Sequence, residues 1–124
     1  MKDRFEGGED ARRRLVTALK SQRIVNGNED CANELADAVE IKEFKKGDVV
    51  IKQDAIDTTI FLVLVGSVDV LVHGRKVAER DAGLDIGAMA MIDVSAKRSA
   101  TVEASEDSVL GIVTEEQFLS LIHI

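Results

Sequence analysis

The chain has 124 residues, of which 45% are hydrophobic and 31% are charged, a composition that suits one small globular domain rather than a disordered chain. Its net charge of −7 excludes a nucleic-acid-binding protein, because phosphates require a basic surface. The apolar run at residues 60–65 is too short to span a bilayer, and residues 1–14 contain no signal-peptide run. We therefore expect a cytoplasmic protein with no membrane contact and, with one cysteine, no internal disulfide.

The N-terminal part of the chain is predicted to be helical. Residues 9–24 form an amphipathic pattern whose apolar face comprises Leu15, Val16 and Leu19. The arginines at positions 12–14 are interpreted as a solvated face of this helix. Asn26-Gly27 then has the chemistry of a turn. We therefore divide the chain into an N-terminal helical segment, residues 1–27, and a second unit, residues 28–124.

A second helix is predicted to begin after Asn28, whose side chain can cap it. Two acidic residues follow in its first turn, where the helix dipole favours negative charge. Cys31, Leu35 and Val39 line its inner face, so the cysteine is interpreted as a small core residue.

From residue 39 the period of the hydrophobic pattern changes toward two, which indicates β-strands. The β-rich runs are 39–43, 49–51, 59–65, 68–72, 76–79, 101–104 and 108–113. The turn signals between them are Lys45–Asp48, Gly66-Ser67, His73–Arg75 and Ser105–Asp107. Short strands with closely spaced turns predict a mainly β fold with flanking helices, an antiparallel β-roll or jelly roll of about eight strands.

The C-terminal residues are predicted to form one more helix. Thr114 and Gln117 have the spacing of a capping box, in which each side chain bonds the other residue's main-chain N–H. The apolar face of this helix comprises Phe118, Leu121 and Ile122.

Residues 86–102, IGAMAMIDVSAKRSATV, combine a glycine-led turn with an arginine and small residues. This combination suits a buried phosphate, because N–H groups at a helix start attract an anion and a guanidinium binds it with two hydrogen bonds. The candidate phosphate-binding residues are Gly87, Ala88, Met89, Arg98, Ser99 and Ala100. The alternative is that Arg98 lies on the surface at the start of a strand and Gly87 only permits a turn.

The same stretch resembles the phosphate-binding cassette of the cyclic nucleotide-binding domain family, F-G-E-[LM]-A-L, a short spacer, then P-R-[SA]-A-T. The matching residues are Gly87, Met89, Ala90, Arg98, Ser99, Ala100 and Thr101. Matches upstream, at the family's spacing, are Phe44, Gly47, Asp48, Ile51, Asp57, Phe61 and Gly66. The resemblance covers most of the chain in the right order and implies the family's β-roll, with a ligand phosphate on Arg98.

The cassette also departs from the family pattern, so it resembles a degenerate site. Ala88 stands where the family has a glutamate that accepts a hydrogen bond from the ribose 2′-hydroxyl, and losing that bond costs roughly 1.5–3 kcal/mol. Lys97 replaces the proline, and Asp54 replaces a turn glycine, which aspartate tolerates. The family's closing helix would lie beyond Ile124, and we expect the loss of its cover to cost roughly 2–3 kcal/mol more. We therefore expect weak or no ordinary cAMP or cGMP binding.

The sequence contains no arrangement typical of catalysis. His73 and His123 are far apart, whereas metal enzymes need clustered ligands. The serines have no histidine base nearby. Asp85 and Asp93, beside the cassette, are interpreted as solvated turn residues that disfavour tight anion binding. We expect no enzyme, no metal and no cofactor.

Two functions remain open for a small regulatory signalling module. In the first, the module senses cAMP, cGMP or another phosphorylated small molecule, if the site compensates for its departures. In the second, a degenerate β-roll binds a partner protein. Arg98 and its neighbours favour the first and Ala88 favours the second.

Overall fold

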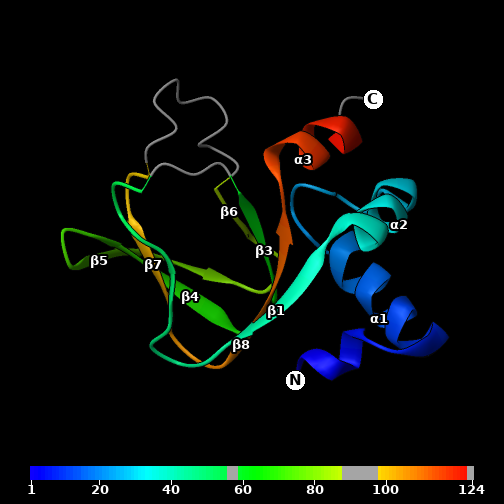
Figure 1. The fold of residues 1–124 in the computed structure, drawn as a ribbon, viewed down its shortest axis with the longest axis horizontal. Coiled ribbons are helices and arrows are strands. Elements are labelled where there is room, and N and C mark those ends of the chain that lie inside the picture. The colour runs from blue at the N-terminus through cyan, green and yellow to red at the C-terminus, as the bar shows by residue number, and fades with distance from the viewer. Residues whose placement is uncertain (56–58, 88–97, 123–124) are drawn as a thin grey trace.

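Figure 1 shows the computed structural model of the chain, which describes residues 1–55, 59–87 and 98–122. The N-terminal elements are a 3₁₀ helix, η1 (Lys2–Phe5), and two α-helices, α1 (Gly8–Lys20) and α2 (Glu29–Ala38). The strands that follow are β1 (Glu40–Phe44), β2 (Val49–Ile51), β3 (Ile60–Val65), β4 (Ser67–Val72), β5 (Arg75–Asp81), β6 (Asp85–Ile86), β7 (Thr101–Ala104) and β8 (Ser108–Val113). The last described element is the helix α3 (Glu115–Ile122).

The described strands form two four-stranded sheets, in the orders β1-β8-β3-β6 and β2-β7-β4-β5. Neighbouring strands are antiparallel throughout. In Figure 1, α1, α2 and α3 gather on one side of the strands. The prediction of a mainly β, antiparallel roll with flanking helices is therefore confirmed.

Strand β3 belongs to both hydrophobic cores, which explains its unbroken apolar sequence. Ile60, Leu62 and Leu64 are part of the cluster between the helices and the first sheet. Phe61 and Val63 alternate with them and belong to the cluster between the two sheets. Because successive side chains of a strand point to opposite faces, a strand covered on both sides must be apolar at every position.

Helix α1 ends four residues earlier than the sequence pattern predicts. It stops at Lys20, and Gly27 N–H closes the following turn by donating to the Lys20 carbonyl over 3.1 Å. Asn26 and Gly27 adopt the left-handed conformation there, with φ of 52° and 79°, which confirms the predicted turn. Gln22 lies just beyond the helix, where its side-chain amide donates to the Val63 carbonyl over 2.8 Å.

The predicted capping of the other two helices is confirmed. The Asn28 side-chain oxygen accepts from the N–H of Cys31 over 2.9 Å at the start of α2. Cys31 is buried, and this burial raises the pKa of its thiol, as expected of a core cysteine. At α3, Gln117 N–H donates to the Thr114 hydroxyl and Thr114 N–H to the Gln117 side-chain oxygen, each over 3.1 Å. None of the described helices has both the length and the apolar character that a membrane crossing requires.

Gly66, between β3 and β4, occupies a position that no larger residue fits. Its φ is 93°, and a Cβ there would lie 2.3 Å from Ser108 Oγ and 2.8 Å from the Asp107 carbonyl oxygen. Gly74 has a similar φ of 80° but no atom within 4 Å of such a Cβ. At both positions any other L-residue would be strained by the left-handed backbone conformation, but only at Gly66 would its Cβ also clash with neighbouring atoms.

We therefore expect Gly66→Ala to lower the free energy of unfolding by about 1–3 kcal/mol more than Gly74→Ala does. Urea denaturation of both variants measures the difference. Equal losses would show that the contact with Ser108 relaxes without cost.

Candidate functional site

Arg98, the first described residue after position 87, is buried, with 5% of its surface exposed. Its Nη2 donates a hydrogen bond to the main-chain carbonyl of Thr59, the residue that precedes β3. Its main chain is fixed as well, because its N–H donates to the Ala55 carbonyl over 2.9 Å and its carbonyl accepts from Asp54 N–H over 2.8 Å. The alternative interpretation, in which Arg98 is a surface residue, is therefore wrong.

Gly87 lies against the Arg98 guanidinium at the end of β6. Its φ is 96°, and a Cβ there would lie 2.6 Å from Nη1 of Arg98 and 2.8 Å from the Thr59 carbonyl oxygen. Glycine is thus required both by the backbone conformation and by the close approach of the arginine. The structure brings together two of the predicted site residues, Gly87 and Arg98, and adds the Thr59 carbonyl.

The other predicted site residues are placed only in part. Ser99 is exposed and Ala100 half-buried, directly before β7. Ala88 and Met89 lie outside the described residues, as do Asp57, Asp93 and His123, so the predicted part of Ala88 and Met89 in phosphate binding stays a prediction. Asp54 has a φ of 72°, which confirms that aspartate tolerates the turn where the family usually has glycine.

The interpretation of Asp85 as a solvated turn residue is wrong. It is 8% exposed and lies in β6, a short strand that the sequence pattern did not reveal, opposite Leu62 of β3. Its Oδ1 lies 3.4 Å from Nη2 of Arg23. Arg23 also donates its main-chain N–H to the Gly83 carbonyl over 2.8 Å. The turn after α1 is therefore joined to the segment that leads into Gly87.

Thr59, Arg23 and Gln22 were not identified from the sequence. Thr59 contributes a main-chain carbonyl, for which its side chain gives no signal. Arg23 and Gln22 act on residues 62 and 41 positions away, and no local pattern indicates such distant contacts.

The described part of the site offers one buried cation, the Arg98 guanidinium, which suits recognition of an anion. Among the residues that the structure describes, no group of three or more His, Cys, Asp or Glu side chains could hold a metal ion.

This architecture defines a class of small ligand-binding β-rolls that carry a buried arginine beside a glycine turn. The sequence matches the cyclic nucleotide-binding domain over residues 41–124, so the chain belongs to that family. The predicted family resemblance is thereby confirmed. Domains of this family are regulatory modules, and this chain covers the binding domain.

Relatives of this chain include a longer protein. This chain is 39% identical over 121 residues to the Pycsar effector protein BcPycTIR of Burkholderia cepacia, and the match covers 98% of this chain and 40% of that protein. The chain therefore spans less than half the length of this relative.

Solved structures share the fold at low sequence identity. The regulatory domain of Toxoplasma gondii PKA, solved with cAMP, superposes with a TM-score of 0.79 at 24% identity, over 91% of this chain and 46% of that one. The regulatory subunit of a cAMP-independent protein kinase A from Trypanosoma cruzi, bound to guanosine, gives 0.81 at 20% identity, over 94% and 42%.

Proposed function

We propose that this chain is the cyclic nucleotide-sensing module of a longer signalling protein related to the Pycsar effectors. The observation that carries the proposal is the buried guanidinium of Arg98, held against Gly87 and the Thr59 carbonyl. A guanidinium shielded from water attracts a phosphate more strongly than an exposed one, because the local dielectric constant is lower. The ligand's phosphate would bind Arg98, with Gly87, Ala88, Met89, Ser99 and Ala100 lining the same site.

The site is proposed to bind ordinary cAMP and cGMP weakly or not at all. Ala88 has no acceptor for the ribose 2′-hydroxyl, and the missing bond weakens binding by roughly 1.5–3 kcal/mol, or about one to two decades. We therefore expect the dissociation constant for cAMP to lie above the low-micromolar range. Calorimetric titration with the 3′,5′-cyclic nucleotides of the four common bases, and with inorganic phosphate, tests this expectation. A low-micromolar or tighter value for cAMP would show that another contact replaces the glutamate.

The second candidate function, a β-roll that binds a partner protein, is favoured by the same alanine. Absence of binding by every nucleotide and by phosphate would support it against the sensor.

A further inference from the structure

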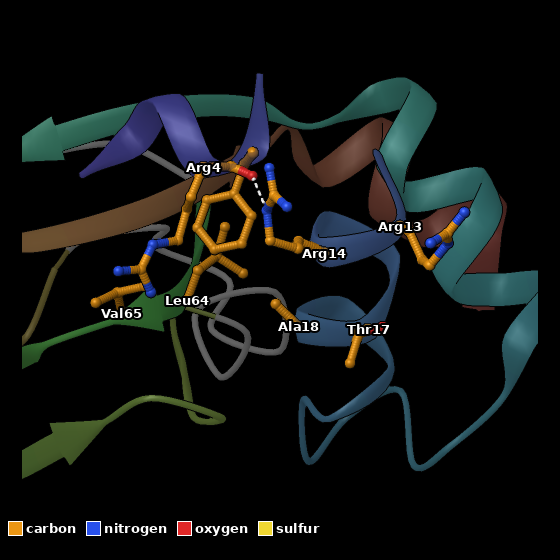
Figure 2. A pocket seen from close by; sticks show the side chains of 8 residues that line it. Arg4, Arg13, Arg14, Thr17, Ala18, Leu64 and Val65 are labelled. Atoms are coloured by element: carbon orange, nitrogen blue, oxygen red, sulfur yellow. Dashed lines mark hydrogen bonds between the residues drawn. The ribbon is translucent and has the colours of Figure 1, made fainter. Parts of the chain in front are cut away.

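A pocket of about 370 Å³ lies between η1, α1 and β3. Figure 2 shows the side chains that line it, which are Arg4, Phe5, Arg13, Arg14, Thr17, Ala18, Leu64 and Val65. None of them belongs to the candidate cyclic nucleotide site. The pocket is therefore a separate feature of the helical side of the domain.

Two arginines of this pocket have no acidic partner in the described part of the chain. Arg14 is oriented by its Nε, which donates to the Arg4 carbonyl over 2.7 Å. Within residues 1–55, 59–87 and 98–122, no carboxylate lies at ion-pair distance from the guanidinium of Arg4 or Arg14. By contrast, Arg13 lies 3.4 Å from Asp10, and in Figure 2 its side chain points away from the other two. Two positive charges without a described counter-charge thus flank one pocket of a chain whose net charge is −7.

The remaining surface of the pocket is mostly apolar. Phe5 and Leu64 are each 7% exposed, and Val65 and Ala18 are half-buried. An apolar floor under two guanidinium groups complements a ligand that has one anionic group attached to an apolar body, because each part then meets its preferred surroundings.

We propose that this pocket binds a peptide segment of a partner protein in which one carboxylate stands beside a large apolar side chain. The volume is compatible with this occupant, since it lies within the roughly 300–1,000 Å³ typical of ligand pockets and admits a large apolar side chain with part of the adjoining main chain. The charge favours it. Nucleic acids, anionic membranes and a second copy of this acidic chain are all repelled by a net charge of −7, whereas a single carboxylate is repelled far less.

The test is an NMR titration of the isotopically labelled chain with the peptide acetyl-Gly-Phe-Glu-Leu-Gly-amide. We expect the amide signals of Ala18, Leu64 and Val65 to shift, and added salt to weaken the binding. The peptide with Gln in place of Glu should bind about tenfold more weakly, because it loses the charge-assisted bonds. Arg4→Gln and Arg14→Gln should each weaken binding of the Glu peptide about three- to tenfold, whereas Arg13→Gln should leave it unchanged.

Several results would overturn the proposal. One is an absence of shifts at millimolar peptide, and another is equal affinity for the Glu and Gln peptides. Equal binding of acetyl-Gly-Ala-Glu-Ala-Gly-amide would mean that only surface charge is involved. Tighter association with phosphatidylserine vesicles than with the peptide would assign the pocket to a membrane surface, and concentration-dependent dimerisation lost in Arg14→Gln would assign it to a second copy. An unchanged melting temperature of the unliganded variants shows that they are folded.

Discussion

Arg98→Ala is expected to abolish measurable binding of cyclic nucleotides and of inorganic phosphate. Arg98 is 5% exposed, so a phosphate bound there would be desolvated and would depend on the guanidinium for its neutralisation. Removing one partner of such a buried ion pair costs roughly 3–5 kcal/mol, or about two to three and a half decades of affinity. Calorimetry measures this loss directly. A ligand at about one hundred times its dissociation constant should stabilise the parent by about 2.7 kcal/mol, and this stabilisation should vanish in the variant.

Arg98→Lys is the matched control for this prediction. Lysine keeps the positive charge but not the planar fork that binds two phosphate oxygens, so we expect an intermediate affinity. The main-chain bonds of residue 98 to Ala55 and Asp54 do not depend on the side chain, so the local fold should persist in both variants. If Arg98→Ala retained the parent's affinity, the phosphate would bind elsewhere and the proposed site would be wrong.

The elements that could be predicted from the sequence are those whose determinants are local. The β-rich run at residues 59–65, the cap at Asn28 and the capping box at Thr114 each depend on residues a few positions apart, and all three occur in the structure. His73 and Gly74 likewise form the expected hairpin tip between β4 and β5, with φ of 50° and 80°.

The features that could not be predicted depend on contacts between distant segments. Helix α1 stops at Lys20, and Gln22 beyond it bonds the Val63 carbonyl, a contact that helix periodicity does not contain. Asp85 is buried because β6 pairs with β3, and Arg23, 62 positions earlier in the sequence, lies at ion-pair distance from it. An acidic residue beside a glycine turn otherwise indicates a solvated loop, so the local interpretation was wrong for this physical reason.

The candidate site could be predicted from the sequence only in part. The pairing of a glycine turn with an arginine was visible in the spacing of the cassette, and the structure places Gly87 and Arg98 in contact. The Thr59 carbonyl that accepts the hydrogen bond of the guanidinium belongs to the chain segment before β3, so the cassette sequence does not predict it.

Ala88→Glu is expected to strengthen cAMP binding by about one to two decades. The introduced carboxylate stands at the position of the family's cassette glutamate and can accept the ribose 2′-hydroxyl bond that alanine cannot. Calorimetric titration of parent and variant with cAMP measures the gain, and 2′-deoxy-cAMP provides a control that lacks the hydrogen-bond donor. The gain should disappear with the deoxy analogue, because the carboxylate then has no donor to bind.

Ala88→Gln offers a neutral acceptor of the same length and should give a smaller gain, since bonds to charged groups are the stronger ones. If the folded Ala88→Glu variant bound both ligands no better than the parent, Ala88 would not be what limits cAMP affinity. A gain that was equal for both ligands would show that the carboxylate acts on the site in some way other than through the ribose.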